Sequence, residues 1–573
     1  MKNNAIFQAQ EFSNIKDIIY HSAKTYSDCI AFVKKHKNKD KVTYENITYR
    51  RLLEDVNQLG TMFYHMQLQG KRVAVIGKNQ YEWVVAHLAN LLGGIVSVPL
   101  DKDLELGELE NSLIRSKVDC IVFDEKLKDK IDIIKEKQHT NLSEFVSMTK
   151  IEGYPCVEEW IQLGKSLMEN GQTEYVHAKI DENVMNILLF TSGTTAQSKA
   201  VMLSQKNIAS NIYALQSVED IRETDTNIAF LPFHHIFGST CLMMMLACGV
   251  KTVFPDGLRY IKQNLNEYKV TVFVGVPVLI EAIYKTIMKE IEKQGKTKLI
   301  KVAKTLSNGL LKVNIDVRRK LFKQILEALG GELRFVISGG APADPEVLKG
   351  FREFGIEVAQ GYGLSETSLV VCAENYEVTK PGSVGVPMIN NTVEVVNKDE
   401  NGIGEIRVKG PNVMLGYYEM PEVTAEVLKD GWFYTGDLGY IDEEGCLFIT
   451  GRSKNMIVLK NGKKIFPEEL ETLVNRLDIV EECMVFGMPD KQDKDDVKVS
   501  VKVVYNKELV EEKYKDLSKE ELYKLVWGQI KELNTEFPRY KHMQHMILTE
   551  EELIKTTTKK VKRQEEMKRI CED

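Results

Sequence analysis

The stretch Thr191–Ser204, which reads TSGTTAQSKAVMLS, decides how the rest of the sequence is interpreted. The apolar run 186–190 (NILLF) precedes it and predicts a buried strand, and the apolar residues after Lys199 are expected to open a helix. Backbone amides, hydroxyls and an ammonium group are what a polyphosphate requires, so the stretch predicts a phosphate-binding loop. The residues that supply these groups are Thr191, Ser192, Gly193, Thr194, Thr195 and Lys199.

The spacing of this stretch nearly fits the Walker-type loop GxxxxGK[ST] but departs from it at two positions. Ser198 stands where the second glycine belongs, and Ala200 stands where the magnesium-binding hydroxyl belongs. We therefore predict a phosphate loop of a different kind. Taken alone, the stretch is explained equally well by a polar turn between a strand and a helix.

Upstream of this stretch, predicted strands and helices alternate. A short hairpin (41–44 and 45–49) and a helix (50–66) are followed by strands at 72–76, 95–100 and 120–124 and by helices at 81–92 and 106–116. This alternation predicts an α/β fold with parallel strands and helices on the sheet faces.

Downstream, four more predicted strands end in clusters of glycine, proline, histidine or hydroxyl residues. Strands 227–231, 270–274, 333–337 and 356–359 lead into Pro232–His235, Gly275–Pro277, Ser338–Pro342 and Gln360–Gly363. Open α/β sheets bind ligands at the carboxyl ends of their strands, so these clusters predict one ligand-binding edge. Residues 278–330 predict two basic helices with a solvated face, and the apolar run 241–250 predicts a core helix.

The character of the sequence changes near residue 381. Short alternating strands, such as 392–396 and 404–409, predict a β-rich subdomain over about 381–452. Residues 453–573 predict a small α+β domain with a hairpin at Asn461-Gly462, a helix starting at Pro467, and a capping box (Ser518, Glu521) before a helix at 519–536.

Composition limits the classes of function. A chain of 573 residues predicts two or more domains, and its net charge of −7 disfavours a general nucleic-acid binder. Nine scattered cysteines without a CxxC pair, an N-terminus without an apolar core and no apolar run long enough to span a membrane predict a cytoplasmic protein without an integral membrane segment.

The motifs, taken in order, resemble those of the adenylate-forming (AMP-binding) superfamily, which includes the acyl-CoA synthetases. The resemblance covers essentially the whole chain and rests on TSGTTAQSKAVMLS, LPFHHIFG, SGGAP, QGYGLSET, YTGDLGYID, GRSKNMI and TTTKKVKR. The stretches YEWVVAHLAN, VSVPLDKDL and LGGELRFVISGGAPADPEV are most similar to long-chain fatty-acid–CoA ligases. Such enzymes join a carboxylate to AMP with release of pyrophosphate, and coenzyme A then displaces the AMP.

The resemblance implies a large N-terminal domain (1–452) of mixed and parallel sheets, a hinge (453–455) and a small mobile C-terminal domain (456–573). It also implies ATP, Mg²⁺ and coenzyme A as ligands and gives each motif residue a role. The nucleotide would contact Thr191–Thr195 and Lys199, Gly339, Gly340, Ala341 and Pro342, Gln360, Gly361, Tyr362 and Gly363, Thr367, Asp437 and Arg452. Glu366 would bind Mg²⁺, Lys454 would be the hinge, and Lys460 and Gly462 would face the coenzyme A channel. The catalytic residues would be Lys560, His235 and Thr191.

Each role has a structural alternative. His234 and His235 could exchange roles, Tyr362 could be a core aromatic, and Lys555, Lys559, Lys560 and Lys562 could be a solvated basic face. The sequence also departs from the family pattern at Ala196, Ser198 and Ala200, where the family usually has glycine or proline. If residue 196 needs a positive φ, alanine there costs about 1 kcal/mol. Lys559 replaces a usual glycine, so it could substitute for Lys560.

The sequence therefore predicts an ATP- and Mg²⁺-dependent fatty-acid–CoA ligase. An adenylating enzyme that loads a carrier protein, or that uses an aryl or short carboxylate, is the main alternative. A nucleotide-binding module without turnover and a membrane or nucleic-acid adaptor that uses the basic tail are further ones. The acyl chain length and the oligomeric state, including a homodimer, remain open.

Overall fold

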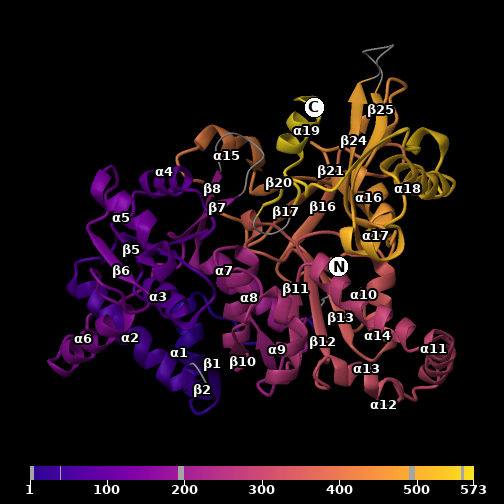
Figure 1. Ribbon diagram of the computed structural model, residues 1–573. Coiled ribbons are helices and arrows are strands. Elements are labelled where there is room, and N and C mark those ends of the chain that lie inside the picture. Colours follow the sequence, from indigo (N-terminus) through magenta and orange to yellow (C-terminus); the bar gives the residue numbers. More distant parts are fainter. Residues whose placement is uncertain (1–4, 39–40, 192–198, 490–496, 557–559, 573) are drawn as a thin grey trace. The chain divides into compact units, whose positions relative to one another are not determined.

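The computed structural model of the chain (Figure 1) describes residues 5–38, 41–191, 199–489, 497–556 and 560–572. Contacts between residues divide the chain into two compact units. The first unit comprises Met1–Thr191, Ser198–Val393 and Val408–Phe433, and the second comprises Ser192–Gln197, Glu394–Arg407 and Tyr434–Asp573. The predicted hinge at 453–455 thus falls within the second unit.

The first unit contains a seven-stranded sheet of mostly parallel strands. In spatial order its strands are β18 (Gly416–Tyr417), β8 (Lys199–Ser204), β7 (Met185–Thr191), β4 (Val96–Leu100), β3 (Arg72–Ile76), β5 (Cys120–Phe123) and β6 (Glu144–Ser147). Alternate residues of β3 point to two different cores. Val73 and Val75 pack with α2 (Tyr49–His65) and α3 (Tyr81–Leu92), whereas Ala74 and Ile76 pack with α4 (Leu106–Ser116) and α5 (Lys128–Lys137). Burial on both faces explains the uninterrupted apolar sequence of this strand.

A nine-stranded sheet forms the rest of this unit's framework. Its order is β15 (Val386–Pro387), β14 (Cys372–Ala373), β13 (Glu357–Tyr362), β12 (Phe335–Gly339), β11 (Val272–Gly275), β9 (Thr226–Ile228), β10 (Lys251–Val253), β1 (Ile30–Asn38) and β2 (Lys41–Thr48). Phe335 and Ile337 face α8 (Ile236–Ala247), and Val336 faces α10 (Pro277–Lys293) and α14 (Pro345–Glu353). Each sheet thus lies between two helical layers, as the strand–helix alternation predicted.

The remaining helices of the first unit surround these sheets. They are α1 (Ile15–Thr25), α6 (Val157–Glu169), α7 (Gln205–Gln216), α9 (Ile261–Tyr268), α11 (Thr297–Leu311), α12 (Arg318–Leu321), α13 (Lys323–Ala328) and α15 (Pro421–Val427). None of the helices among the described residues combines the length and the apolar character that crossing a bilayer requires.

A five-stranded sheet occupies the predicted β-rich segment. It consists of β16 (Thr392–Val396), β17 (Gly404–Lys409), β20 (Trp432–Ile441) and β19 (Leu428–Lys429), with β21 (Leu447–Arg452) paired to β20. The predicted strands 392–396 and 404–409 are confirmed without a shift of either end.

The C-terminal part of the second unit is α+β. It contains the pair β22 (Ile457–Val458) and β23 (Lys464–Ile465), the sheet β24 (Val480–Pro489), β25 (Val497–Tyr505) and β26 (His545–Thr549), and the helices α16 (Pro467–Val474), α17 (Lys507–Lys513), α18 (Lys519–Asn534) and α19 (Arg563–Glu572). The turn at Asn461-Gly462 has a positive φ at the glycine, and the Ser518–Glu521 capping box is present. These local predictions are confirmed because each depends on neighbouring residues alone.

Three local predictions were wrong. The residues after Lys199 form β8, antiparallel to β7, and the helix begins only at Gln205. The N-terminal hairpin pairs Ile30–Asn38 with Lys41–Thr48, so its first strand lies earlier than expected. The segment 278–330 forms four helices, α10 to α13, where two were expected.

Candidate active site

The predicted phosphate-binding loop connects two paired antiparallel strands. Thr191 closes β7 and Lys199 opens β8, and the two residues are paired across the strands. The Thr191 hydroxyl donates to the Lys199 carbonyl at 3.1 Å. The predicted loop residues Ser192, Gly193, Thr194 and Thr195, together with Ala196 and Ser198, lie outside the described residues. The described ends nevertheless place a hydroxyl and an ammonium group at one sheet edge.

A tyrosine connects the lysine of this loop to the predicted magnesium ligand. β18 pairs with β8, which brings Tyr417 beside Lys199, and the Lys199 ammonium lies 4.5 Å from the centroid of the Tyr417 ring. The Tyr417 hydroxyl donates a 2.8 Å hydrogen bond to Oε1 of Glu366. Lys199, Tyr417 and Glu366 therefore form one cluster, although they come from three separate segments.

The backbone around Glu366 is held by a tight turn. Leu369 has a positive φ of 123°, and a Cβ on Gly363 would lie 1.4 Å from the Leu369 carbonyl oxygen, so position 363 admits only glycine. Thr367 is buried, and its hydroxyl accepts from the Leu364 N–H at 3.0 Å. These contacts fix the direction in which the Glu366 carboxylate projects.

The two predicted adenine-binding segments end neighbouring strands. In the register of β12 and β13, Gly339 pairs with Gly361 and Ser338 pairs with Gln360. The absence of a side chain at Gly339 makes room for Phe237, whose ring would lie 3.1 Å from a Cβ there. The structure thus brings together the pairs predicted to line one base, namely Gly339, Gly340, Ala341 and Pro342 with Gln360, Gly361, Tyr362 and Gly363.

The two histidines differ in their surroundings. His234 is buried, and its Nε2 lies 3.4 Å from a carboxylate oxygen of Asp101, which follows β4. Asn79 fixes the loop before them, because its side chain donates to the Leu231 carbonyl at 2.7 Å and accepts from the Phe233 N–H at 3.0 Å. His235 is half-buried and stands at the N-cap position of α8, without a side-chain hydrogen bond to the first turn. His234 is thus the more buried of the two histidines and lies beside a carboxylate.

The second unit brings together the two predicted ribose contacts. Asp437 on β20 is paired with Arg452 on β21, and the Arg452 Nε lies 2.7 Å from the Asp437 carboxylate. Asp437 is buried, while Arg452 is more than half exposed. The buried carboxylate is therefore paired with a largely exposed cation.

The predicted hinge and channel residues lie in turns. Lys454 is exposed within a turn in which the Asn455 N–H donates to the Arg452 carbonyl at 3.0 Å. Lys460 and Gly462 lie in the loop between β22 and β23, where Gly462 has a φ of 78°. Any residue with a side chain at position 462 would be strained in this conformation, which glycine adopts without strain.

The lysines of the C-terminal segment are not equivalent. Lys555 forms ion pairs with Glu482 and Glu552 at 3.0 and 2.9 Å, and Lys562 pairs with Glu565 at 3.1 Å. Lys560 is exposed, and its N–H donates to the Thr556 hydroxyl. Lys559 lies outside the described residues. Lys555 and Lys562 thus take part in ion pairs with acidic residues.

The residues around Glu366 fit a magnesium ion. Tyr417 donates to Oε1, and among the described residues no hydrogen bond reaches Oε2. Magnesium binds one or two carboxylates together with phosphate oxygens, and Lys199 adds a second positive group for those phosphates. A second candidate set, Asp101, His234 and His235, has its ligand atoms within 4.8 Å of one another.

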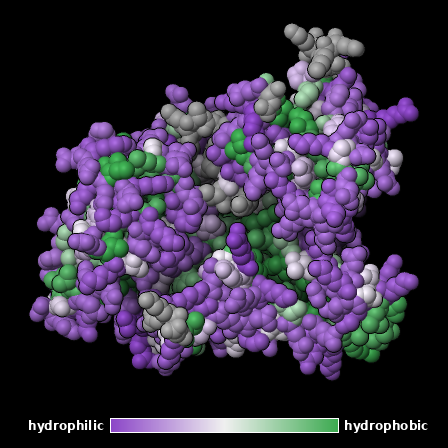
Figure 2. Space-filling view, viewed as in Figure 1, coloured by the Kyte–Doolittle hydropathy of each residue, from purple (hydrophilic) through white to green (hydrophobic). Residues whose placement is uncertain are grey.

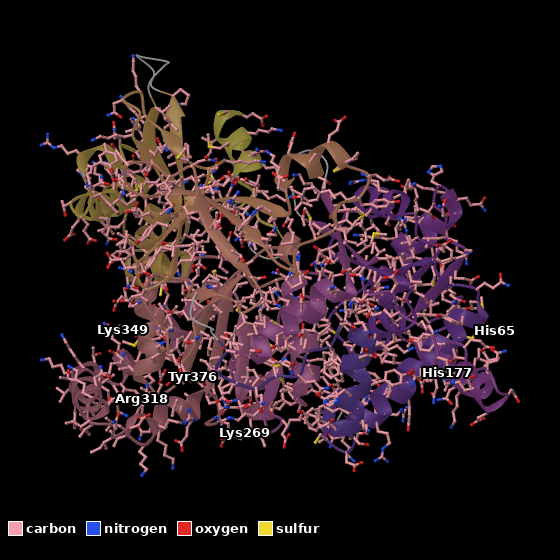
Figure 3. The ribbon with its side chains drawn as sticks, turned by 180° about the vertical axis from the view of Figure 1, so that it is seen from behind. His65, His177, Lys269, Arg318, Lys349 and Tyr376 are labelled. Carbon is pink, nitrogen blue, oxygen red and sulfur yellow. The ribbon has the colours of Figure 1, made fainter. Side chains whose placement is uncertain are left out.

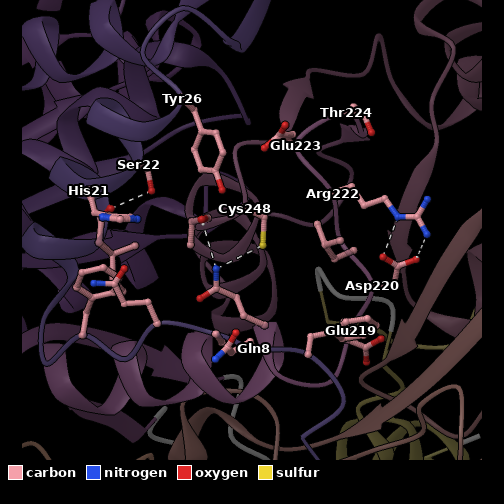
Figure 4. Close-up of a pocket in the computed structure, with 18 residues that line it drawn as sticks. Gln8, His21, Ser22, Tyr26, Glu219, Asp220, Arg222, Glu223, Thr224 and Cys248 are labelled. Atoms are coloured by element: carbon pink, nitrogen blue, oxygen red, sulfur yellow. Dashed lines mark hydrogen bonds and ion pairs between the residues drawn. The ribbon is translucent and has the colours of Figure 1, made fainter.

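A cavity of about 500 Å³ lies elsewhere in the first unit (Figure 4). The N-terminal segment, α1 and residues 216–224 line it, and it contains none of the candidate residues above. Burial and the nearby Glu374 raise the pKa of Glu219, one of its lining residues, to about 8. This cavity does not belong to the candidate active site.

Sequence reasoning missed Tyr417, Asp101 and Asn79. Tyr417 lies in a GYY run that carries no motif signal, and its partner Glu366 is far away in the sequence. Only the pairing of β18 with β8 reveals the contact. Asp101 and Asn79 directly follow β4 and β3, so their positions at strand ends were the one available signal.

Comparison with known proteins identifies the family. The AMP-binding enzyme family matches residues 19–418, and the AMP-binding enzyme C-terminal domain matches residues 454–572. The chain belongs to the AMP-binding enzyme family. Within it, the chain is an adenylate-forming enzyme of the acyl-CoA ligase type, as the ordered motifs predicted.

Individual relatives differ in their acids and acceptors. Long-chain-fatty-acid–CoA ligase 5 of Rattus norvegicus is 30% identical over 480 residues, which is 78% of this chain and 69% of that protein. A chloroplastic long-chain-fatty-acid–[acyl-carrier-protein] ligase of Arabidopsis thaliana is 26% identical over 610 residues, covering 93% and 82%. The crystal structure of an anthranilate CoA ligase with anthranoyl-AMP shares the fold, with a TM-score of 0.77 at 20% identity and 98% of each chain covered.

Proposed function

We propose that this protein activates a fatty acid with ATP and transfers the acyl group to coenzyme A. The observation that carries the proposal is the cluster of Lys199, Tyr417 and Glu366 beside Thr191, in a chain of the AMP-binding enzyme family. A cation, a carboxylate and a hydroxyl at one sheet edge suit the phosphates of a nucleotide better than they suit a packed core.

In the first half-reaction, a carboxylate oxygen of the fatty acid attacks the α-phosphorus of ATP. The bond from this phosphorus to the bridging oxygen breaks, and pyrophosphate leaves with the electron pair. Such a transfer depends on positioning and on neutralising charge. Thr191, Ser192, Gly193, Thr194, Thr195, Lys199 and Thr367 would hold the phosphates, and His235 and Lys560 would meet the charge that develops at the α-phosphate.

Glu366 would hold Mg²⁺, with Tyr417 keeping the carboxylate in place. When bound, the ion would neutralise charge on the phosphate oxygens. Tyr362 and Gly339–Pro342 would enclose the adenine, and Asp437 would accept both ribose hydroxyls beside Arg452. The ion pair that already holds Asp437 would keep the carboxylate ready for these hydroxyls.

In the second half-reaction, the thiol of coenzyme A loses its proton to water and its sulfur attacks the acyl carbon. The bond from this carbon to the phosphate oxygen breaks, and AMP leaves with the electron pair. Because one face cannot serve both steps, residues 456–573 would turn about Lys454 and present Lys460 and Gly462 to the incoming thiol. The domain limits of the sequence interpretation, with 1–452 before the hinge, belong to this proposal. So does a cytoplasmic location, where ATP and coenzyme A are available.

The fatty acid is proposed because of the relatives, whose names include long-chain fatty-acid ligases. An acyl-carrier-protein acceptor is the second candidate, since one relative is named for it. The test is pyrophosphate release by the purified chain with acids from acetate to palmitate and with aryl acids, followed by thioester formation on coenzyme A or on a carrier protein. Release with aryl acids alone, or transfer to the carrier alone, would refute the proposal.

A further inference from the structure

An exposed apolar stripe runs along α11 in the first unit. Leu299, Val302 and Leu306 are 64%, 66% and 59% exposed, and their spacing of three and four residues places them on one helix face. Val313 and Ile315, just beyond the helix, are 63% and 50% exposed. Figure 2 shows these residues as a hydrophobic patch at the position that α11 occupies in Figure 1. We call this set the α11 patch.

The α11 patch is not an unfinished part of the core. The opposite face of α11 already packs inward, with Ile300 and Ala303 against the core that α10 and α14 share. Lys304 on this inner face pairs with Glu353 at 3.0 Å and lies 4.3 Å from the ring centroid of Phe354. The helix is therefore fixed by its inner face, while its outer face leaves apolar side chains in water.

Basic side chains surround the α11 patch. Residues 293–323 contain ten lysines and arginines and one acidic residue, Asp316, although the whole chain has a net charge of −7. Asp316 itself forms an ion pair with Arg318, whose side chain is labelled in Figure 3. Lys298, Lys301 and Lys312 are exposed and take part in no ion pair recorded among the described residues. The region thus carries an uncompensated positive charge next to exposed apolar groups.

We propose that the α11 patch and its lysines form a docking surface for the anionic surface of a lipid bilayer. Leucine and valine beside lysine on one helix face are the pattern of a helix that lies in the bilayer interface. Lysines near such a surface are attracted to acidic lipid headgroups, and this attraction is screened by salt. The docking surface holds the protein at the membrane without crossing it.

The composition favours a bilayer over a protein partner. Protein interfaces are enriched in tryptophan, tyrosine and arginine and depleted in lysine, whereas the α11 patch has leucine, valine and isoleucine flanked by lysine. It also contains no tryptophan or tyrosine to anchor it in a neutral bilayer. Binding should therefore depend on anionic lipid, with each lysine contributing about fivefold in affinity.

The test is sedimentation of the full chain with vesicles of phosphatidylcholine and phosphatidylglycerol, compared with vesicles of phosphatidylcholine alone. We expect binding to the anionic vesicles at low salt, and loss of that binding at high salt. The double variant Lys298→Gln/Lys301→Gln should lose about twentyfold in affinity, and Leu299→Ser/Leu306→Ser should lose at least tenfold. The control Leu163→Ser replaces an apolar residue on α6 that is 52% exposed, and this variant should bind as the unaltered chain does.

Several results would overturn the proposal. Absence of binding to anionic vesicles would do so, as would equal binding to neutral ones or unchanged binding by both double variants. Self-association of the chain that Leu299→Ser/Leu306→Ser abolishes, without vesicle binding, would assign the patch to a protein interface. Thermal unfolding and pyrophosphate release check that the variants fold, and the lysine variant alters exposed side chains only, so it decides the matter if the leucine variant is unstable.

Discussion

Replacing Tyr417 by phenylalanine tests the cluster on which the proposed activity depends. The change deletes the hydroxyl that donates a 2.8 Å hydrogen bond to Glu366, but it keeps the ring beneath the Lys199 ammonium. A hydrogen bond to a charged group contributes about 1.5–3 kcal/mol. If the bond serves to orient the carboxylate for magnesium, its loss should lower the rate of pyrophosphate release by about 10-fold to 100-fold.

The assay is pyrophosphate release at a series of magnesium concentrations. We expect Tyr417→Phe to need more magnesium for half-maximal rate, because the unoriented carboxylate binds the ion less well. The free energy of unfolding should fall by about 1 kcal/mol or less, since the side chain keeps its ring and Glu366 is open to water.

Tyr418 supplies a matched control. Its hydroxyl accepts from Arg72 at 2.8 Å and has no recorded contact with Glu366, so Tyr418→Phe should leave the magnesium dependence unchanged. The reasoning is refuted if Tyr417→Phe behaves as the unaltered chain does, or if both variants lose activity equally.

Three further predictions concern separate side chains. Lys560→Ala should lower adenylation by about 10²–10³-fold, while Lys562→Ala, which removes a lysine paired with Glu565, should lower it less than tenfold; pyrophosphate release distinguishes them. His235→Ala should lower pyrophosphate release by about 10²-fold, whereas His234→Ala should mainly reduce the melting temperature; the reverse pattern would exchange their roles. The pKa of Glu219 is about 8 in the folded chain and near 4.5 when unfolded, so the carboxyl destabilises the fold increasingly as the pH rises from 4.5 to 8. Glu219→Gln should flatten this decline in denaturant titrations and add on the order of 3 kcal/mol at pH 7, and an unchanged pH profile would contradict it.

The parts of the fold that were predictable are those that local sequence determines. The strand 72–76 and the helix 81–92 were found without a shift of either end, because the apolar run 73–76 and the apolar-rich helix sequence have no competing pattern. The capping box at Ser518 is likewise complete within four residues. By contrast, β1 contains the basic run KKHKN, which does not suggest a strand. Lys35 is accommodated there because it pairs with Asp256 and Glu267 at 2.7 and 2.6 Å, from elements far along the chain.

The candidate site shows the same division. Its glycines and charged residues could be proposed from the sequence because close backbone approach and phosphate charge restrict the residue types that could serve, although their roles stay predictions. Gly363, for example, faces the Leu369 carbonyl so closely that no other residue fits. Tyr417 was not predictable, since its role arises from a strand pairing that places β18 against β8. Every tyrosine has a hydroxyl and a ring, and many are buried. Only its contacts with Lys199 and Glu366 distinguish Tyr417 from the others.

The basic tail illustrates how structure separates residues that the sequence presents as equals. Lys555, Lys560 and Lys562 lie within eight positions, and charge alone assigns them all to one solvated face. The fold places Glu482 of β24 beside Lys555, so that lysine ties the tail to the sheet. Arg563, next in the chain, is nearly buried and donates to the Val485 carbonyl at 2.9 Å. The described residues on both sides of Lys560, namely Lys555 and Lys562 with Arg563, are thus held by ion pairs to other parts of the fold or to their own helix, which sequence alone does not reveal.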